Sequence, residues 1–548
     1  MNAATPPRSI NDNTEVLIVG AGPAGLALAI ELGSRSIACV VIERNERVGY
    51  APRAKTTNVR TREHLRRWGI ASTLAAASPL GLDYPSDVAF VTRLAGFPLA
   101  RFENAFNCAP QRNALYSEHA QWIPQYTLEE ILKTHAQSLP SVQFCFQTEL
   151  DTFVQDDAGV HATVRDLRSG TEHSVHAKYL VGADGARSAV RTAIGAKMVG
   201  AYGLSRNYNI VFRAPGLAEA HPHGRAIMYW QINADVPSLI GPMDVDDTWF
   251  FMPTNVPNDF KVDHAAAADL IRQATGIDLP YEVLSTDEWT ASRLIADRYS
   301  DGRALLIGDA CHLHPPFGGY GMNMGIADGV DLGWKLAAVL RGWGGAELVA
   351  SYEAERRPLH QRVMDEAVAN HAVLGTQLTR AGIEAADENG ARLRAEIGAT
   401  IQEAKVREFR TLGVVLGSHY SGSPLLIDDG SVAAPDQVCD FTPTARPGSL
   451  APHAWLADGG SLYDGFGSGF TLLVMSDENG GDVERAMQDA ASLNIPLTVL
   501  MPRERALGEL YQARMALIRP DQHVAWRGNA WPGTGTDVLA RVCGHGAA

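Results

Sequence analysis

The sequence predicts an α/β fold, in which a doubly wound domain carries an inserted antiparallel sheet and is followed by a smaller α/β unit. A strand, a glycine-rich turn and a helix follow one another over residues 16–32. Aromatic and β-branched segments alternate with Pro, Gly and Asp turns over residues 201–289, the pattern of an antiparallel sheet. A stretch rich in Gly, Pro and Asp at residues 421–452 then separates the last ~100 residues, about the size of one domain.

These changes of texture divide the chain of 548 residues into four parts. The expected ranges are 12–200 and 286–380 for the discontinuous doubly wound domain, 201–285 for the inserted sheet, 381–440 for a helical segment and linker, and 441–548 for the C-terminal unit. A domain usually needs roughly 150 residues, so a chain of this length has room for all of them.

The composition is that of an ordinary globular protein, with 46% hydrophobic and 20% charged residues. A net charge of −15 argues against nucleic acid or an anionic membrane as the main partner. The most hydrophobic stretch, residues 16–32, contains glycines and a proline, which favour strand, turn and helix over a membrane span. The six scattered cysteines form no Cys-x-x-Cys and predict neither a zinc site nor a redox dithiol. These free thiols, and an N-terminus without a signal peptide's apolar core, predict a cytoplasmic protein.

The first motif is a strand at residues 16–19, the turn Gly20-Ala21-Gly22-Pro23-Ala24-Gly25 and a helix to about Leu32. A second strand, residues 37–42, ends in Glu43-Arg44. A G-x-G-x-x-G turn between strand and helix, with an acid about 20 residues on, indicates a dinucleotide site. Glu43 would accept hydrogen bonds from a ribose, and Arg44 would flank the adenine. The alternative is a tight strand–helix turn that binds nothing.

The second motif is an apolar strand that ends in Asp184-Gly185 and leads into a basic helix start with Arg187 and Arg191. An Asp-Gly turn is common and is the alternative interpretation. The two arginines would bind a nicotinamide phosphate or form a solvated helix face, and the sequence does not separate these roles.

The third motif runs from Leu306 to Asn323, with an apolar strand, Asp309 at its end, a Pro/Gly turn and a helix to about Leu340. The turn has few bulky side chains, so backbone N–H groups can approach a ligand. The positive end of the following helix points at the same place, which predicts a large anionic cofactor. A cap of the turn is the alternative role for Asp309. His312 and His314 lie on a loop without a cysteine or carboxylate cluster nearby, so we expect no metal.

The inserted sheet contains aromatic strands at residues 209–212, 227–232 and 248–252. We expect this sheet to form one wall of a substrate cavity. Its aromatic residues Tyr229, Trp230 and Phe250 are interpreted as partly core and partly lining of that cavity.

In this order, the three motifs resemble those of the single-component FAD-dependent aromatic hydroxylases, most closely the branch of phenol, chlorophenol, hydroxybiphenyl and hydroxyphenylpropionate hydroxylases. Further segments extend the resemblance over nearly the whole chain: Asp328, Trp334-Lys335-Leu336, Glu355-Arg356-Arg357-Pro358, Ala451-Pro452-His453, Asp464-Gly465, Gly469-Phe470-Thr471-Leu472 and Arg519-Pro520-Asp521. The resemblance implies an FAD-binding domain of the p-hydroxybenzoate hydroxylase type and a C-terminal thioredoxin-like domain. Without a Cys-x-x-Cys, that last domain is expected to shape a homodimer or close the cavity rather than to carry out thiol chemistry.

The resemblance also implies bound FAD, its reduction by NADH or NADPH, and capture of O2 as a flavin C4a-hydroperoxide. It implies Pro315 and Pro316 at the hydroxylation point, with Phe317 completing a stiff apolar wall that excludes water. The residues expected to contact FAD are Gly20, Gly22, Pro23, Ala24, Glu43, Arg44, Arg53, Gln125, Asp184, Asp309, Pro316, Gly319, Gly321, Met322 and Asn323. Reduction places negative charge on the pyrimidine edge of the flavin, which the N–H groups near Gly321 would stabilise.

Lys55 departs from the family pattern. Phenol hydroxylase relatives have an aspartate, and chlorophenol relatives a histidine, at the position that aligns with it, and that group is thought to assist removal of the phenol proton. A lysine there would stabilise a phenolate or bind a substrate carboxylate. A surface lysine without function is the alternative.

These observations predict an NAD(P)H-dependent hydroxylase that acts on a small phenolic ring in aromatic catabolism. A tailoring hydroxylase of polyketide biosynthesis, an epoxidase or Baeyer–Villiger oxygenase, and a flavin-binding sensor are the alternatives. The sequence leaves open the ring substituents, ortho or para regiochemistry, and the choice of NADH or NADPH.

Overall fold

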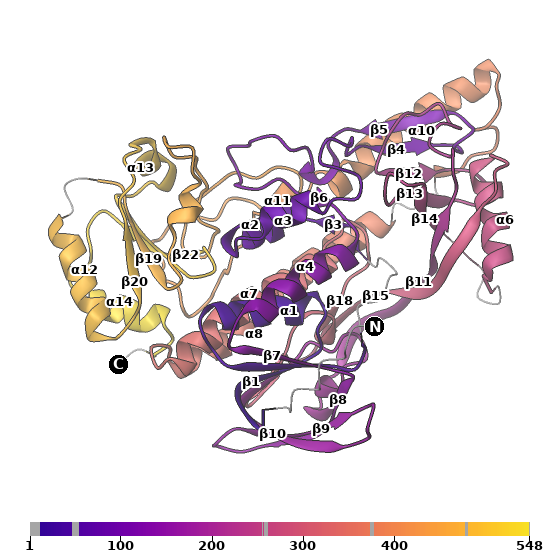
Figure 1. Ribbon diagram of the computed structural model, residues 1–548. Coiled ribbons are helices and arrows are strands. Elements are labelled where there is room, and N and C mark those ends of the chain that lie inside the picture. Colours follow the sequence, from indigo (N-terminus) through magenta and orange to yellow (C-terminus); the bar gives the residue numbers. More distant parts are fainter. Residues whose placement is uncertain are drawn as a thin grey trace.

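The computed structural model describes residues 11–46, 54–254, 256, 261–372, 378–476 and 480–546. Its first sheet has the order β16-β17-β10-β1-β2-β7, with β8 and β9 joined through β10 (Figure 1). The strands are β1 Asn13–Val19, β2 Cys39–Glu43, β7 Val142–Phe146, β8 Thr148–Gln155, β9 Val160–Asp166, β10 Glu172–Gly182, β16 Ser300–Asp301 and β17 Ala304–Leu306. Parallel pairing of β17, β10, β1, β2 and β7 confirms the predicted dinucleotide-binding fold.

Helices α1 Pro23–Ser34, α4 Gln125–Ser138 and α7 Gly321–Leu340 lie together beside this sheet. The backbones of α1 and α7 come close because α7 has glycine at every fourth position along the face that meets α1. A Cβ on Gly329 would lie 2.7 Å from the carbonyl oxygen of Ala24, and one on Gly333 would lie 2.5 Å from Cβ of Glu31. This contact fixes the N-termini of both helices relative to each other.

We expect Gly329→Ala to lower the free energy of unfolding by about 1–3 kcal/mol, as overpacking of a close core contact does. The added methyl would meet the backbone of α1 at Ala24 and Leu28, which has no rotamer freedom to move away. Thermal melting of the variant measures the loss. Gly481→Ala is the matched control, because a Cβ at Gly481 meets no atom within 4 Å. An unchanged melting temperature for Gly329→Ala would contradict the close packing.

The second sheet has the order β18-β15-β11-β14-β13-β12-β4-β5. Its strands are β4 Val88–Val91, β5 Pro98–Phe102, β11 Met198–Arg213, β12 Met228–Gln231, β13 Ser238–Pro242, β14 Thr248–Pro253, β15 Glu282–Ala296 and β18 His312–Leu313. The inserted sheet therefore extends beyond the expected range 201–285 at both ends. In particular, β4 and β5 come from the first 200 residues and join through the parallel pairing of β4 with β12, a long-range pairing that local sequence does not reveal.

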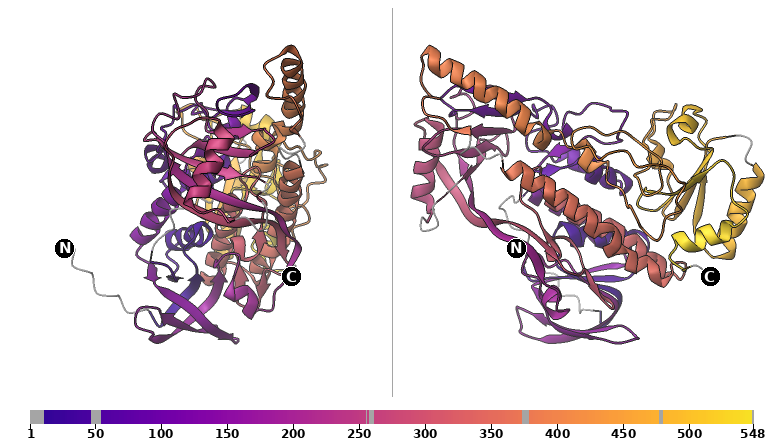
Figure 2. Two further views of the ribbon diagram at one scale, coloured as in Figure 1. Left: turned by 90° about the vertical axis from the view of Figure 1, so that its right-hand side faces the viewer. Right: turned by 180° about the vertical axis from the view of Figure 1, so that it is seen from behind.

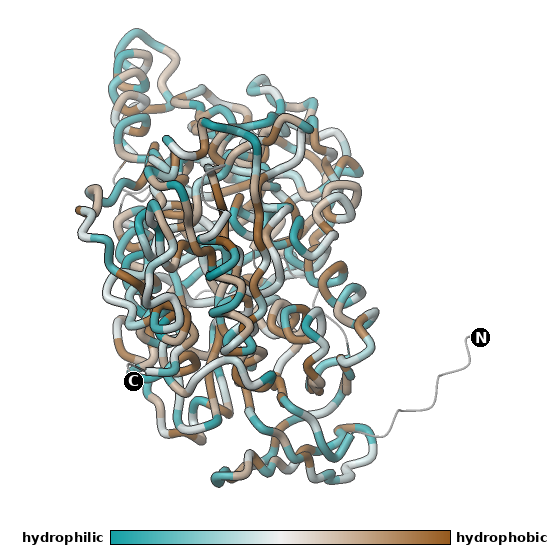
Figure 3. Tube along the Cα trace, turned by 90° about the vertical axis from the view of Figure 1, so that its left-hand side faces the viewer, coloured by the Kyte–Doolittle hydropathy of each residue, from teal (hydrophilic) through white to brown (hydrophobic). Residues whose placement is uncertain are grey.

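Two long helices, α8 Ala346–Ala372 and α10 Glu388–Phe409, cross the back of the molecule (Figure 2). The remaining helices and short strands are α2 Val59–Arg67, α3 Ala71–Ala76, α5 Ala189–Ala193, α6 His264–Thr275, α11 Leu412–Val415, η1 Ala105–Asn107, η2 Gly308–Ala310, η3 Leu462–Gly465, β3 Thr56–Thr57 and β6 Gln121–Trp122. Hydrophilic and hydrophobic segments are interspersed along the coloured part of the trace (Figure 3). Of the helices in the described ranges, none has the length and apolar character needed to cross a membrane.

The C-terminal domain consists of β19 Phe470–Val474, α12 Gly480–Ser492, β20 Leu497–Leu500, α13 Ala506–Tyr511, β21 Met515–Ile518, β22 Val524–Gly528 and α14 Gly535–Val542. Its sheet has the order β20-β19-β21-β22, with only the first pair parallel. This is the topology that the resemblance implies for a thioredoxin-like domain. Phe470 packs against Trp334 of α7, so the domain's core continues onto the first domain.

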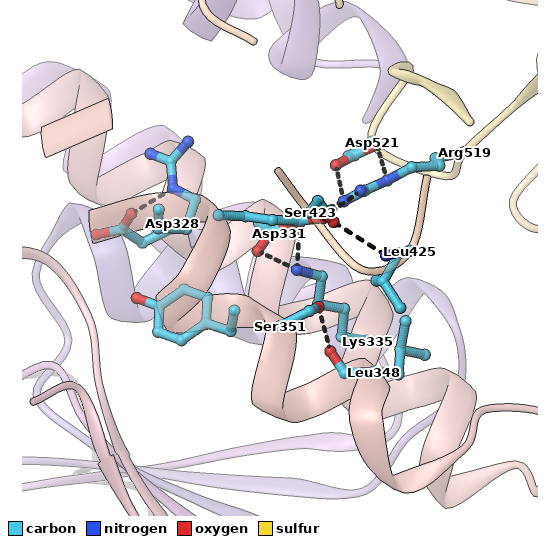
Figure 4. Close-up of polar contacts among 12 residues, drawn as sticks. Asp328, Asp331, Lys335, Leu348, Ser351, Ser423, Leu425, Arg519 and Asp521 are labelled. Atoms are coloured by element: carbon cyan, nitrogen blue, oxygen red, sulfur yellow. Dashed lines mark hydrogen bonds and ion pairs between the residues drawn. The ribbon is translucent and has the colours of Figure 1, made fainter. Parts of the chain in front are cut away.

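A buried cluster of charges also joins the two domains (Figure 4). Arg519 of the C-terminal domain forms two hydrogen bonds with Glu355 of α8, at 2.6 and 2.8 Å. Lys335 of α7 lies 2.6 Å from Glu355 and 2.9 Å from Asp331, and Asp521 accepts from Arg519 at 2.8 Å. The side chains of Arg519, Lys335 and Glu355 have no exposed surface. The domains are thus held by paired charges as well as by apolar packing.

Candidate active site

The three glycines of the first motif have three different surroundings. Gly20 has a φ of +108°, and a Cβ there would lie 2.3 Å from the carbonyl oxygen of Ala183. A Cβ on Gly25 would lie 2.1 Å from the carbonyl oxygen of Gly20, whereas a Cβ on Gly22 would meet no atom within 4 Å. The first and third glycines permit the tight turn and close packing, and the second leaves the N-terminus of α1 open to a ligand. The N-cap residue, Gly22, has no side chain with which to cap this helix.

Glu43 ends β2 beside that turn. Its Oε2 accepts from the N–H of Ala21 at 3.0 Å, and its Oε1 accepts from the N–H of Asn45 at 2.9 Å. The carboxylate is thereby held next to the turn at the carboxyl end of its strand, where dinucleotide ribose is bound in this kind of fold. The neighbouring Arg44 is exposed.

Gln125 begins α4, and its backbone N–H donates to the oxygen of Ala54 at 3.0 Å. Its side chain donates to Glu129 at 2.5 Å. Gln125 therefore lies next to the segment that carries Lys55. Arg53, also expected at the flavin, lies outside the described residues.

Asp184 caps the start of α5, where its Oδ2 accepts from the N–H groups of Ala189 at 2.7 Å and Val190 at 3.2 Å. Its Oδ1 is buried and has no hydrogen-bond partner among the described residues. A buried carboxylate oxygen without a donor fits a site for a ligand hydroxyl. Arg191 donates to the oxygens of Ala310 and Ala186, and so ties this loop to η2, while Arg187 is exposed.

Asp309 lies exposed at the end of β17, and the buried Asp328 of α7 supports the turn behind it. Asp328 accepts from the N–H of Gly308 at 3.0 Å, from Arg356 at 2.8 Å, and lies 2.8 and 2.9 Å from ring nitrogens of His312 and His360. Burial opposes ionisation, but His360, Arg356 and His312 hold the pKa of Asp328 well below its usual range. This network fixes the position of Asp309.

From the sequence we expected no cysteine or carboxylate cluster near His312, and this is wrong. Ligand atoms of Cys311, His312 and Asp328 lie within 4.8 Å of one another. The fold brings in Asp328 from two turns along α7, which spacing in the sequence does not show. However, Asp328 already accepts from Arg356, whose guanidinium would repel a cation, so these contacts fit a hydrogen-bond network rather than a metal site.

The turn after His314 contains a buried Pro315, an exposed Pro316 and a half-buried Phe317. It passes through Gly319, with a φ of +66°, and α7 begins at Gly321 without a side-chain cap. Gly321 and Met322 are half-buried, and a Cβ on Gly321 would meet only Cβ of His314, at 3.8 Å. Since the N-cap residue Tyr320 makes no side-chain cap hydrogen bond, the N-terminus of α7 suits an anionic ring edge.

The side chain of Asn323 forms hydrogen bonds within the protein. Its side-chain Nδ2 donates to the oxygens of Gly319 at 2.7 Å and Thr56 at 2.9 Å, and its Oδ1 accepts from the N–H of Asn58 at 3.0 Å. The side chain is thus used inside the protein to join the turn, α7 and the segment after Lys55.

Lys55 lies on the aromatic wall formed by the second sheet. Its Nζ is 4.1 Å from the ring centroid of Phe250, whose ring covers Gly241, and Trp122 lies 6.3 Å from the same ring. Burial lowers the pKa of Lys55 to about 7, and in the described part of the chain no acid offsets this effect. The amine is therefore poised to gain or lose a proton near neutral pH.

The structure brings Trp230 and Phe317 together, with ring centroids 6.3 Å apart. It places Tyr229 on the opposite face of the sheet, beside Trp249 and His221, because successive side chains of a strand alternate. Two residues near Phe317 were not predicted: His371, at 5.0 Å, and the buried Lys405, whose Nζ is 4.8 Å from Trp230. The signal for Lys405 was its position between Ile401 and Phe409 at helical spacing on the buried face of α10.

Comparisons with known proteins cover nearly the whole chain. Residues 13–367 match the family described as FAD binding domain, and residues 444–546 match aromatic-ring hydroxylase, C-terminal. The chain is 32% identical to tetracenomycin B2 monooxygenase-dioxygenase of Streptomyces olivaceus, over 93% of this chain and 94% of that protein. It is 31% identical to 2,4-dichlorophenol 6-monooxygenase of Delftia acidovorans, over 96% and 97%. Among solved structures, the rebeccamycin biosynthetic enzyme RebC with reduced flavin has a TM-score of 0.89 at 34% identity, covering 97% and 99% of the two chains.

Proposed function

This chain belongs to the family of FAD-dependent aromatic-ring hydroxylases, and from that premise we propose that it uses NAD(P)H and O2 to hydroxylate a phenolic ring held beside Lys55. Family membership confirms the predicted fold class and the prediction of a flavoprotein monooxygenase. The observation that carries the proposal is the amine of the half-buried Lys55 against the ring of Phe250.

The residues that would hold FAD fit its chemistry. The open N-terminus of α1 at Gly22 suits the pyrophosphate, and Glu43 suits the ribose hydroxyls. Asp309 would accept from the ribityl chain, and the uncapped first turn of α7 would face the pyrimidine edge. FAD, when bound, supplies the hydride acceptor and the activation of O2.

Lys55 would act on the substrate's hydroxyl. As the free amine it accepts the phenol proton at Nζ, and the resulting ammonium stabilises the phenolate. An anionic ring oxygen pushes electrons into the ring, which is what hydroxylation of an aromatic carbon requires. Pro315 and Phe317 supply the apolar side of the cavity, where exclusion of water strengthens the contact between ammonium and phenolate.

The second candidate is a tailoring hydroxylase of polyketide biosynthesis, acting on larger polycyclic phenols. The relatives favour it as directly as the first: they include the tetracenomycin B2 enzyme and a putative polyketide hydroxylase beside phenol 2-monooxygenase and the dichlorophenol enzyme. The same site chemistry serves both, and the two proposals differ in the size of the ring system.

One screen tests the proposal. The FAD-loaded protein is mixed with NADH or NADPH and a panel of single-ring and polycyclic phenols, and nucleotide oxidation, hydrogen peroxide and products are measured. A hydroxylated product from either class supports the reaction and selects between the candidates. If no phenol of either size accelerates nucleotide oxidation, the proposal is overturned.

The flavin placement has its own test. We expect Gly321→Ala to weaken FAD binding about tenfold, equivalent to about 1.4 kcal/mol, because its methyl would occupy the space proposed for the ring edge. The fold itself accommodates this methyl, since only Cβ of His314 lies within 4 Å. Quenching of flavin fluorescence measures the dissociation constant, with Gly481→Ala as control. Unchanged FAD affinity in Gly321→Ala would place the ring elsewhere.

A further inference from the structure

The C-terminal domain forms hydrogen bonds with the first turn of α2. Arg60 of α2 donates to the side-chain oxygen of Gln522 at 2.6 Å and to the backbone oxygen of Asp521 at 2.8 Å. It also pairs with Glu63 one turn along, at 3.0 Å. Asp521 and Gln522 are buried and belong to the loop that carries Arg519. This contact is directional, because a guanidinium bonded to two oxygens fixes both the distance and the angle of α2.

The start of α2 is in turn bonded to the candidate site. Asn58 caps the helix by accepting from Thr61 at 2.9 Å, and its own N–H donates to Asn323 at 3.0 Å. Asn323 also binds the oxygens of Thr56 and Gly319. Thr56 directly follows Lys55, and Gly319 lies two residues before the start of α7. Short contacts therefore run without a gap from the C-terminal domain to the lysine and to the helix end proposed to meet the flavin.

We propose that Arg60 is a positioning residue, through which the C-terminal domain sets the place of Lys55 and of the first turn of α7. The proposal rests on the flavin placement given above and assigns a role to a domain that has no Cys-x-x-Cys for thiol chemistry. Arg60 acts through Asn58 and Asn323 and does not itself touch the reacting atoms.

A cavity of about 60 Å³ explains why hydrogen bonds are needed here. Asn58, Arg60, Tyr320, Asn323 and Asp521 are among its walls. An engineered cavity that binds benzene has about 150 Å³, so this one is too small for an aromatic ring. It separates part of α2 from α7 and α8, so close packing alone does not hold the start of α2 in place.

Arg66 provides a matched control. It lies in the last turn of α2 and also binds the C-terminal domain, with hydrogen bonds of 2.7 and 2.8 Å to Asp464. Arg66→Met therefore breaks a contact between the same helix and the same domain, far from Asn58. If these contacts serve only to dock the domain, Arg60→Met and Arg66→Met will have the same effects on the flavin.

The experiment compares both variants with the parent as full-length chains, using FAD as the probe. We expect Arg60→Met to weaken FAD binding about fivefold or more, the lower end of coupling between distinct sites, and to shift the reduction potential of the bound flavin. Arg66→Met should leave both unchanged, and Arg60→Lys should fall between Arg60→Met and the parent. Equal effects in Arg60→Met and Arg66→Met, or no effect in either, would overturn the proposal. Gly321→Ala reports separately on the flavin placement, so the two failures can be told apart.

Discussion

Lys55→Met is expected to lower kcat/KM for the phenolic substrate about a hundredfold or more, the usual contribution of a positioned general base. The Nζ atom lies 4.1 Å from the centroid of Phe250, and burial lowers the pKa of Lys55 to about 7. Methionine has a similar length and removes both the base and the cation that follows from it. Steady-state oxidation of NAD(P)H, with the hydroxylated product quantified, measures the loss.

The role of Lys55 as a base also predicts the direction in which kcat/KM changes with pH. Lys55 is the free amine above a pH of about 7 and the ammonium below it. A base must be unprotonated in the free enzyme, so kcat/KM of the parent should rise with pH through about 7 and then level off. Lys55→Met should lack that rise. If the variant keeps it, another group is responsible and the role of Lys55 is contradicted.

The lowered pKa of Lys55 also predicts that Lys55→Met does not lose activity through unfolding. The folded pKa of Lys55 is below the unfolded value of ~10.4, so its burial opposes folding fully below pH 7, and this opposition fades as the pH rises toward ~10.4. Methionine has no charge to desolvate. The variant should therefore melt at or above the parent's temperature at pH 7.

The sequence was most informative where the chemistry is local. The turn from Gly20 to Gly25 could be predicted, because the tight turn and the close helix contact involve neighbouring residues. The start of α7 could be predicted for the same reason, since the glycines before it and the apolar period after it are contiguous in the chain.

Contacts between residues far apart in the chain could not be predicted from the sequence. Strands β4 and β5 join a sheet whose other strands lie more than 90 residues further on. Asp328 reaches His312 only because α7 folds back against η2, where Asp328 also accepts from the N–H of Gly308. For Tyr229 and Trp230, the sequence could not show which side chain faces the cavity. Adjacent residues of a strand face opposite sides, so only one of the two can belong to a given wall, but local sequence does not say which.

Arg519→Met is expected to lower the free energy of unfolding by about 3–5 kcal/mol, because it leaves buried carboxylates without their main partner. Arg519 bonds Glu355 through both oxygens and also bonds Asp521, and all three side chains are buried. In the variant, Lys335 would still face Glu355 and Asp331, and the Ser423 hydroxyl would still donate to Glu355, but the second positive charge would be gone. Chemical denaturation measures the loss. Arg165→Met is the control, since its pair with Asp151 is more than a third exposed and should contribute less than about 1 kcal/mol.

Acid sensitivity separates this mechanism from simple loss of packing. Burial opposes ionisation of Glu355, but Arg519 and then Lys335 hold its pKa well below the usual range. A carboxyl with a lowered folded pKa contributes stability that is complete at pH 7 and declines as the pH falls below the ordinary glutamate value of ~4.3. The difference between parent and Arg519→Met should therefore shrink in acid. A double variant, Arg519→Met with Glu355→Gln, should recover part of the loss, since it removes a carboxylate that the single variant leaves unpaired. A constant difference at all pH values, with additive effects in the double variant, would show that Arg519 stabilises the interface through its packing and not its charge.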